Sequence, residues 1–367
     1  MRAAVLESYG EPLALRDLPT PDPDPDGAVV RVDACGVCRS DWHAWKGHGE
    51  WADDQVPTGQ ILGHEPAGEV VAVGETVSRF TVGDSVVVPF SLGDGTCRYC
   101  RRGHGNVCTD GRALGFDPAT PGAFAEHVAV PAADHNLVAR PDWLEARDTA
   151  ALGCRYMTAY HALVEQAGLA GGDWLAVHGC GGVGLSAVQL GVALGARVIA
   201  VDIDDEARDR ARKLGARHTI RPGSANAGAE TPGADAQPTV PERIREITGG
   251  GADVSMDALG IDETCRNSVR SVRPRGIHVQ VGLTTDAERG SVSLPTDWMT
   301  RWEVSFVGAR GMPPTAYDDL FALIEASGID PGALVTRELS LAAVSDRLAA
   351  MDDYAVRGVE VVTDFSD

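Results

Sequence analysis

Short apolar runs separated by turn-forming residues fill the first 150 residues of the chain. Runs rich in Val lie between Gly, Pro and Asp at residues 27–36, 68–74, 83–90 and 124–131. Because β-branched residues favour strands and Gly, Pro and Asp favour turns, this pattern predicts a mostly-β region with long loops.

The pattern changes near residue 151, where apolar runs begin to alternate with segments of helical character. Strands that alternate with helices in this way indicate βαβ units and a parallel sheet. Gly195 and Gly215 follow two of the predicted helices and act as stop signals. The predicted elements are strand 174–179, helix 183–195, strand 197–202, helix 205–216, and strands 252–259 and 276–282.

Two further segments complete the pattern of elements. Residues 221–242 are polar and rich in Gly, Pro and Ala, which predicts an exposed insertion. The last part of the chain contains a strand near residues 304–308, a helix near 317–327 and a final strand near 359–362.

Length, charge and cysteine content restrict the class of protein. The 367 residues are too many for a single small core and suit two domains, and the net charge of −21 disfavours nucleic acid and anionic membranes as partners. No apolar run approaches the ~18 residues of a membrane span, and charges interrupt the N-terminus, so we expect a cytoplasmic protein. In a large protein of this kind, 8 cysteines favour metal or catalytic sites over disulfides.

The basic residues are almost all arginine, since Lys46 and Lys213 are the chain's two lysines. An acidic surface with few lysines is typical of adaptation to high salt. A GC-rich genome produces the same composition, because it favours Arg, Ala, Gly and Asp codons. Both explanations stay open.

A glycine-rich motif carries the first functional signal. Gly179, Gly181 and Gly184 form the pattern G-x-G-x-x-G, with Gly182 and Val183 inside it, after a predicted strand and at the start of a predicted helix. Such a turn lets the backbone approach a pyrophosphate at a helix N-terminus. Asp202 ends the next strand, 18 residues after Gly184. A carboxylate there accepts hydrogen bonds from ribose hydroxyls and repels a 2′-phosphate, so NAD is favoured over NADP.

Two sets of cysteine and histidine have the composition of metal sites. Cys38, His64 and Cys154 are dispersed along the chain and can form a site with three protein ligands and one open position. Spacing alone does not show that they meet, because buried cysteines are commonly small core residues. Cys97, Cys100 and Cys108 are spaced as the ligands of a second, closed site, which needs a fourth ligand.

The motifs CGVCRSDWH, GHEPAGEVVAVG, GDSVVV, GTCRYCRRGHGNVC and GCGGVGLSAVQL resemble those of the zinc-dependent medium-chain alcohol dehydrogenases over essentially the full chain. The resemblance implies an α/β protein with a GroES-like twisted β catalytic domain and a Rossmann doubly wound parallel-sheet domain. It places the catalytic domain at residues 1–154, with a zinc lobe at about 91–112. The Rossmann domain follows at 155–298, and residues 299–367 return to the catalytic domain.

The resemblance also assigns roles to single residues. Cys38, His64 and Cys154 match the catalytic zinc ligands, and Glu65 matches a catalytic glutamate that can approach the metal and assist ligand exchange. The residues expected to assist catalysis are Asp41, which orients His64, Ser40, which takes the substrate proton, and His43, which passes it to solvent. The remaining matches are Arg39 as a pyrophosphate contact, Phe90 as a substrate-pocket aromatic, Trp42, Trp45 and Trp51 as pocket or core residues, and Arg357 as a second pyrophosphate contact.

The second zinc lobe of the family has the form Cys-x2-Cys-x2-Cys-x7-Cys. In this chain the first position of that pattern is Asp94, followed by the three cysteines at 97, 100 and 108. Aspartate is an accepted zinc ligand, so we expect it to complete the site. His104 and Asp110 are rivals by composition, and a lobe that folds without zinc is the remaining alternative.

The function implied is NAD-linked oxidation of alcohols to aldehydes or ketones, and the reverse. The expected cofactors are NAD and two Zn²⁺ ions per chain, one catalytic and one structural. A polyol or sugar dehydrogenase is the nearest alternative, although Cys154 speaks against it. A zinc-free quinone reductase or an inactive scaffold would have lost ligands that this chain retains. The expected partner is a small alcohol or aldehyde, and the resemblance favours a homotetramer, with a dimer as the alternative.

Overall fold

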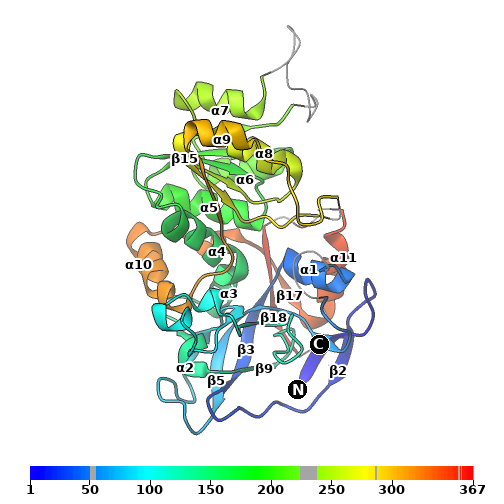
Figure 1. Ribbon diagram of the computed structural model, residues 1–367. Helices are drawn as coiled ribbons and strands as arrows, with labels where there is room; N and C mark the ends of the chain where they lie inside the picture. The colour runs from blue at the N-terminus through cyan, green and yellow to red at the C-terminus, as the bar shows by residue number, and fades with distance from the viewer. Residues whose placement is uncertain (50–54, 224–237, 286, 354–355, 357, 367) are drawn as a thin grey trace. The chain divides into compact units, whose positions relative to one another are not determined.

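The computed structural model describes residues 1–49, 55–223, 238–285, 287–353, 356 and 358–366, and the chain divides into two compact units. Unit 1 contains Met1–Met157 together with Gly311–Asp367, and unit 2 is Thr158–Arg310. Figure 1 shows the course of the chain and the elements within each unit. No helix among the described residues is long and apolar enough to cross a membrane, and the cytoplasmic location stays a prediction.

A seven-stranded sheet forms the centre of unit 1. Its central pairs are antiparallel, and the strands at the chain's C-terminal end pair in parallel. The order is β10 (Val138–Ala139), β6 (Ser85–Val87), β5 (Glu65–Val73), β3 (Ala28–Val37), β18 (Val359–Asp364) and β17 (Val335–Ser340), and β9 (His127–Val130) pairs with β3. The mostly-β region predicted from the sequence is therefore confirmed, and strands distant in sequence lie side by side in it.

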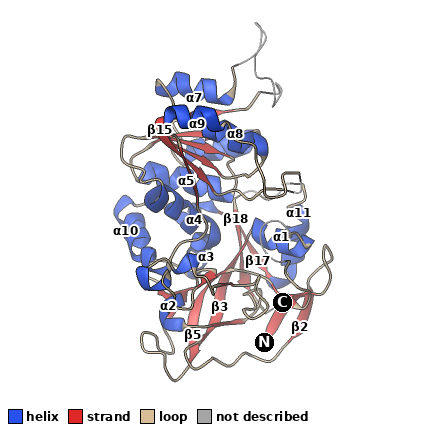
Figure 2. Cartoon of the chain, viewed as in Figure 1, coloured by secondary structure: helices blue, strands red, loops and turns tan. Residues whose placement is uncertain are grey.

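Smaller elements complete the β part of unit 1 (Figure 2). One three-stranded sheet contains β1 (Arg2–Leu6), β2 (Ala14–Asp17) and β4 (Gln60–Ile61). A two-stranded sheet of β7 (Ser91–Leu92) and β8 (Arg112–Ala113) brackets the short helices η1 (Cys100–Arg102) and η2 (Gly105–Val107). The pairing of these two strands joins the two ends of the cysteine-rich segment.

Helices of 4 to 11 residues connect the strands of unit 1. The helix α1 (Arg39–Lys46) starts directly after β3, and the π-helical turn η3 (Leu152–Tyr156) continues α3 (Ala146–Ala151). Gly153 has non-helical angles inside this turn, with φ −42° and ψ −127°. The other helical elements are α2 (Ala133–Asn136), η5 (Pro314–Ala316), α10 (Tyr317–Ser327), η6 (Pro331–Leu334), η7 (Leu341–Ala343), α11 (Val344–Ala350) and α4 (Met157–Tyr160), which runs into unit 2.

Unit 2 is built on a six-stranded parallel sheet. The order is β13 (His218–Ile220), β12 (Arg197–Val201), β11 (Trp174–His178), β14 (Ala252–Asp257), β15 (Val272–Gln280) and β16 (Ser305–Gly308). Its helical elements are η4 (His161–Gln166), α5 (Gly182–Ala193), α6 (Asp205–Lys213), α7 (Val240–Thr248), α8 (Asp262–Ser271) and α9 (Thr296–Trp302).

The strand order reverses direction between β11 and β14. The helices α5 and α6 contact each other, and so do α7 and α8. Because crossovers between parallel strands are right-handed, the reversal places these two pairs on opposite faces of the sheet. Ligands of doubly wound sheets bind at the carboxyl ends of the strands beside such a reversal, and the glycine-rich motif follows β11 there.

Two sequence expectations differ from the structure in their boundaries. The polar segment 221–242 ends in a helix, because Thr239 and Glu242 form a capping box and α7 starts at Val240; residues 224–237 lie outside the described part. The unit boundaries at 157/158 and 310/311 differ from the expected 154/155 and 298/299. The second difference arises because β16 pairs in parallel with β15 and so belongs to the sheet of unit 2.

Candidate active site and metal centres

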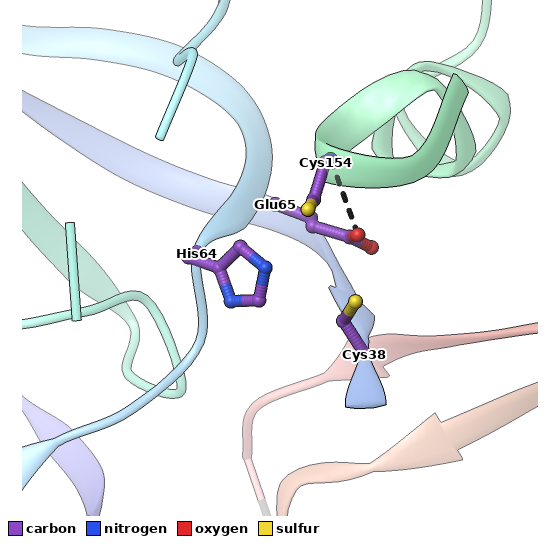
Figure 3. Close-up of side chains that lie close together, drawn as sticks. All are labelled: Cys38, His64, Glu65 and Cys154. Carbon is purple, nitrogen blue, oxygen red and sulfur yellow. Dashed lines mark hydrogen bonds between the residues drawn. The ribbon is translucent and has the colours of Figure 1, made fainter. Parts of the chain in front are cut away.

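Cys38, His64, Glu65 and Cys154 converge in unit 1. One possible ligand atom from each lies within 4.8 Å of the others. Cys38 lies at the N-terminus of α1, His64 and Glu65 lie at the start of β5, and Cys154 lies in the π-helical turn η3 (Figure 3). The fold therefore brings together three residues proposed from the sequence as ligands, although the chain between Cys38 and Cys154 is long.

Asp41 fixes the orientation of His64. The carboxylate is fully buried and accepts hydrogen bonds from the Cys38 N–H at 2.9 Å and the Gly63 N–H at 3.1 Å. His64 Nδ1 lies 2.8 Å from the same carboxylate, so Nδ1 carries the proton and donates it. The other ring nitrogen, Nε2, is buried and has no hydrogen-bond partner among the residues that the structure describes. A buried lone pair beside two thiols fits a zinc ion, which accepts imidazole and thiolate ligands.

The surroundings of Cys38 favour the thiolate form of its side chain. A hydrogen bond from Cys154 is the largest cause of a pKa well below the usual cysteine value, and His64 and Arg155 act in the same direction against burial. Metal binding requires a deprotonated sulfur, so this environment favours a cation at the site.

Glu65 is held by two donors rather than by solvent. It accepts the Cys154 N–H at 3.1 Å and the Arg155 guanidinium at 2.5 Å, and its side chain is fully buried. Burial raises the pKa of Glu65 to about 7, while the charge of Arg155 acts against that rise. Arg155 itself has only 7% of its side chain exposed.

The three other residues predicted near this centre, Ser40, His43 and Arg39, each contact different neighbours. Ser40 Oγ lies 3.9 Å from Cys38 Sγ, and His43 Nδ1 lies 3.2 Å from His48 Nδ1. The guanidinium of Arg39 lies 4.2 Å from the ring centre of Trp42 and donates to the Met351 carbonyl at 3.1 Å.

The aromatic candidates divide into neighbours of the centre and core residues. The Phe90 ring is buried 5.7 Å from the His64 ring, in a T-shaped arrangement. Trp45 is buried and donates to the Glu11 carbonyl, which indicates core packing. Trp42 donates to Asp352 at 2.6 Å. Trp51 and Arg357 lie outside the described residues.

A second cluster joins Asp94 to Cys97, Cys100 and Cys108, with ligand atoms within 4.8 Å of one another. The Asp94 carboxylate accepts the N–H groups of Cys97 at 2.9 Å and Thr96 at 2.8 Å, which lower its pKa. Hydrogen bonding, chiefly from the Cys100 N–H, lowers the pKa of Cys97 to about 7. An ionised carboxylate beside three sulfurs, one of them an easily formed thiolate, fits a closed zinc site.

The rival fourth ligands lie outside this cluster. Within the described chain, neither His104 nor Asp110 belongs to the group of converging ligand atoms. His135, which sequence reasoning did not single out, packs against the lobe. A Cβ added to Gly93 would lie 2.7 Å from His135 Nε2 and 2.9 Å from Cys100 Sγ.

The glycine motif of unit 2 has the geometry of a dinucleotide cradle. Gly179 has φ +90°, and a Cβ on Gly184 would lie 1.8 Å from the Gly179 carbonyl oxygen, so both positions require glycine. A Cβ on Gly181 would meet nothing within 4 Å and would project into the space that a pyrophosphate needs. Gly182 and Val183 form the first turn of α5, whose N–H groups face this space.

Asp202 follows β12 and is tied to the same loop. Its carboxylate accepts the N–H groups of Cys180 at 2.6 Å and Asp204 at 2.8 Å. These bonds fix the carboxylate at the carboxyl end of the sheet, where the ribose of a dinucleotide is expected.

Sequence reasoning missed two residues beside the first centre. Arg155 follows Cys154 in the buried run AALGCRYM, and a lone charge inside an apolar run is a signal for a buried ion pair. The Phe116 ring lies 4.8 Å from the His64 ring, and no feature of the sequence pointed to it.

A thiolate–imidazole centre together with a Rossmann dinucleotide cradle defines a metal-dependent dehydrogenase as a class, and comparison with known proteins supports this. Residues 24–142 match the family model of the alcohol dehydrogenase GroES-like domain, and residues 182–326 match that of the zinc-binding dehydrogenases. An NAD-dependent alcohol dehydrogenase of Sulfurisphaera tokodaii is 32% identical over 99% of each chain. A sorbitol dehydrogenase of Halalkalibacterium halodurans is 30% identical over 93% of each chain.

Solved structures agree. The alcohol dehydrogenase TADH from Thermus sp. ATN1 superposes with a TM-score of 0.85 and 31% identity, over 99% of each chain. The chain belongs to the zinc-dependent medium-chain dehydrogenase family. The fold class expected from the sequence, a GroES-like domain with a Rossmann domain, is thereby confirmed.

The role of Asp94 can be tested by substitution. We predict that Asp94→Ala lowers the zinc content from about two towards about one per chain under a chelator, because three thiolates leave one position open. Asp94→Cys should retain both ions. Atomic absorption after dialysis against the chelator measures the content.

Asp94→Asn is the matched control, because its side-chain oxygen still accepts the Thr96 and Cys97 N–H groups. In Asp94→Ala, loss of these two hydrogen bonds alone should lower the free energy of unfolding by about 1 kcal/mol. Retention of both ions by Asp94→Ala would assign the fourth ligand to another group, such as His104.

Proposed function

We propose that this protein is an NAD-linked, zinc-dependent alcohol dehydrogenase that interconverts alcohols with aldehydes or ketones. The observation that carries the proposal is the convergence of Cys38, His64 and Cys154, together with a His64 Nε2 that has no hydrogen-bond partner in the described part of the chain. Three protein ligands with an open position are typical of catalytic zinc, whereas structural zinc has four. The names of the full-length relatives point to the same reaction.

The residues of the chain would share the work as follows. Cys38, His64 and Cys154 hold the zinc, which supplies Lewis-acid polarisation of the substrate oxygen when bound. Asp41 keeps the proton of His64 on Nδ1, so that Nε2 remains available. Ser40 accepts the alcohol proton at Oγ, and His43 delivers a proton to solvent. Phe90 forms an apolar wall beside His64.

The cofactor-binding residues have roles that follow from their geometry. The open side of Gly181 and the N–H groups of the first turn of α5 would receive the pyrophosphate. The Asp202 carboxylate would accept the ribose hydroxyls and repel a 2′-phosphate. Arg39 would add a positive charge for the pyrophosphate. These residues would hold NAD, which would supply the hydride-accepting chemistry when bound.

A polyol or sugar dehydrogenase is the second candidate. The similarity to a sorbitol dehydrogenase at 30% identity favours it. Cys154 speaks against it, because polyol enzymes of this family often carry a carboxylate at that position. Activity on polyhydric alcohols, compared with activity on simple alcohols, distinguishes the two candidates.

The activity is tested with a series of primary, secondary and polyhydric alcohols, assayed with NAD and NADP at low and multimolar KCl. We expect turnover of simple alcohols with NAD, and Asp202→Gly should relax the preference against NADP by about tenfold, which is 1.4 kcal/mol. Faster wild-type turnover with NADP would contradict the role of Asp202. Activity that rises with KCl would favour salt adaptation as the cause of the acidic composition, and activity that falls would favour genome composition.

The proton path predicts unequal effects of two substitutions. Ser40→Ala should lower kcat by about 100-fold or more while zinc content stays unchanged, because the alcohol proton loses its acceptor. His43→Gln should lower kcat less, since water can partly replace the imidazole. Steady-state kinetics with a parallel zinc assay measure both. An unchanged kcat in Ser40→Ala would exclude this path.

A homo-oligomer, for which the resemblance favours a tetramer, is supported by exposed aromatic side chains near the last strand of the unit 2 sheet. The strand β16 ends the sheet, and Trp302 and Phe306 are 37% and 39% exposed. The helix α9 contributes no buried residue in the single chain. Light scattering should give a mass of several times 38.5 kDa, and Trp302→Glu should lower it. A wild-type mass of one chain would contradict the proposal.

A further inference from the structure

Polar side chains on β14, α8 and β15 form a continuous hydrogen-bonded chain inside unit 2. Ser255, Asp257, Ser268 and His278 are each fully buried. The bonds that link them, with Gln280, are Ser255 Oγ to Ser268 Oγ at 2.8 Å, Ser268 Oγ to His278 Nδ1 at 2.8 Å, His278 Nε2 to Gln280 Oε1 at 3.1 Å and Gln280 Nε2 to Asp257 Oδ2 at 3.0 Å. Buried polar groups cost free energy even when they are paired, so such a chain calls for a functional reason.

The amide of Gln280 sets the direction in which protons are donated along this chain. Its Nε2 lies 3.0 Å from Asp257 Oδ2 and 2.8 Å from the Gly282 carbonyl oxygen. An ionised carboxylate and a carbonyl can only accept, so both positions require the NH2 group of the amide. The amide oxygen therefore faces His278, and Nε2 of that ring carries the proton and donates it.

The rest of the chain follows from this tautomer of His278. With the proton on Nε2, Nδ1 is an acceptor, so the Ser268 hydroxyl donates to it and accepts from Ser255 in turn. Burial lowers the pKa of His278 to about 4, which keeps the ring neutral near pH 7. Every bond of the chain thus donates in one direction, towards the carboxylate of Asp257.

Asp257 uses its other carboxylate oxygen to hold the turn at residues 258–260, at the carboxyl end of β14. Oδ1 accepts the N–H groups of Leu259 at 3.0 Å and Gly260 at 3.2 Å. The backbone carbonyl of Asp257 also accepts the Gly282 N–H at 2.9 Å, from the turn that follows β15. One residue therefore fixes the backbone at the ends of two neighbouring strands.

The turn at residues 258–260 packs against the first glycine of the dinucleotide motif. A Cβ on Gly179 would lie 3.2 Å from Leu259 Cβ and 3.5 Å from the Leu259 backbone nitrogen. The Ala258 N–H donates to the His178 carbonyl at 2.9 Å, which ties the turn to the end of β11. Because β11 and β14 flank the reversal of strand order, where dinucleotides bind, the turn forms one side of the dinucleotide cradle.

We propose that Asp257 is a positioning residue, oriented by the donor chain behind it, that holds the turn at residues 258–260 in place for the bound dinucleotide. This inference rests on the proposed function, because it requires that unit 2 bind NAD. A carboxylate suits the position because both of its oxygens accept, one from the turn and one from Gln280. A turn that is ordered before the cofactor arrives lowers the entropy lost on binding.

The variant Asp257→Asn tests the chain through the tautomer of His278. The new side-chain oxygen can still accept from the turn, but its NH2 group then faces the NH2 group of Gln280, and two donors repel. Rotation of the Gln280 amide relieves this and moves the His278 proton to Nδ1. Solid-state NMR of 15N-histidine-labelled protein distinguishes the tautomers, and the His278 signals are identified by their loss from His278→Gln. We expect Nε2–H in the wild type and Nδ1–H in Asp257→Asn.

The affinity for NAD tests the positioning role. Rotation of the Gln280 amide also breaks its bond to the Gly282 carbonyl, so both turns loosen. The Kd for NAD, measured by calorimetry, should rise by about tenfold in Asp257→Asn. The kcat at saturating NAD and alcohol should not fall, because no reacting group has changed.

Two serines of α8 provide a matched pair of variants. Ser268→Ala removes the donor to His278 and should raise the Kd for NAD by about threefold. Ser271 is also fully buried on α8, but it donates to the Asn267 carbonyl at 2.6 Å and lies outside the chain. Ser271→Ala should therefore keep the wild-type tautomer and Kd, whatever its melting temperature, which separates lost stability from lost positioning.

A wild-type Kd for NAD in Asp257→Asn would overturn the positioning role, as would an equal loss of affinity in Ser271→Ala. An Nδ1–H signal for His278 in the wild type would overturn the donor chain itself. Should Asp257→Asn fail to fold, Gln280→Met, which also removes a donor to Asp257, and Ser268→Ala carry the test. A wild-type protein that binds no NAD would reject the proposed function, and this failure is distinguishable from variants that bind NAD as the wild type does.

Discussion

The buried carboxylate of Asp41 is the constraint on which the candidate active site depends. It joins the N-terminus of α1, the Gly63 N–H and the His64 ring, and so ties the end of β3 to the start of β5. A fully buried carboxylate is costly unless every oxygen is satisfied, and here three donors satisfy it. The same bonds that tie the ends of these antiparallel neighbours together set the tautomer of His64. The hydrogen bonds of Asp41 therefore serve both the local fold and the chemistry of the site.

The periodicity of the sequence predicted the elements of both units well. The Val-rich runs became β3, β5, β6 and β9, and the alternation after residue 151 became the parallel sheet of unit 2. These predictions succeeded because buried strands and amphipathic helices impose strict patterns on side chains. The boundary of unit 2 was harder, because β16 joins its sheet by pairing with β15, and a pairing partner leaves no mark in the strand's own sequence.

The same limit applies to the site: residue types and motifs are visible in the sequence, whereas contacts between distant residues appear only in the structure. Residue type made Cys38, His64 and Cys154 candidates, and the family resemblance matched them to zinc ligands. The family pattern also pointed to Asp94, which the structure places beside three cysteines. The roles of the single residues remain proposals. The pairing of Arg155 with Glu65 spans ninety positions and depends on two glycines that leave room for it. In the sequence, Arg155 is recognisable as a charge inside an apolar run, but nothing there identifies Glu65 as its partner.

The most direct test is a crystal structure of the zinc-loaded protein with anomalous scattering recorded at the zinc edge. The account predicts a peak bonded to the sulfurs of Cys38 and Cys154 at about 2.3 Å and to His64 Nε2 at about 2.0 Å. No fourth cysteine or histidine of the chain should be bonded to the metal, because a catalytic site keeps one position for substrate. The absence of a peak there, or a peak that lacks a bond to one of these three residues, would contradict the account.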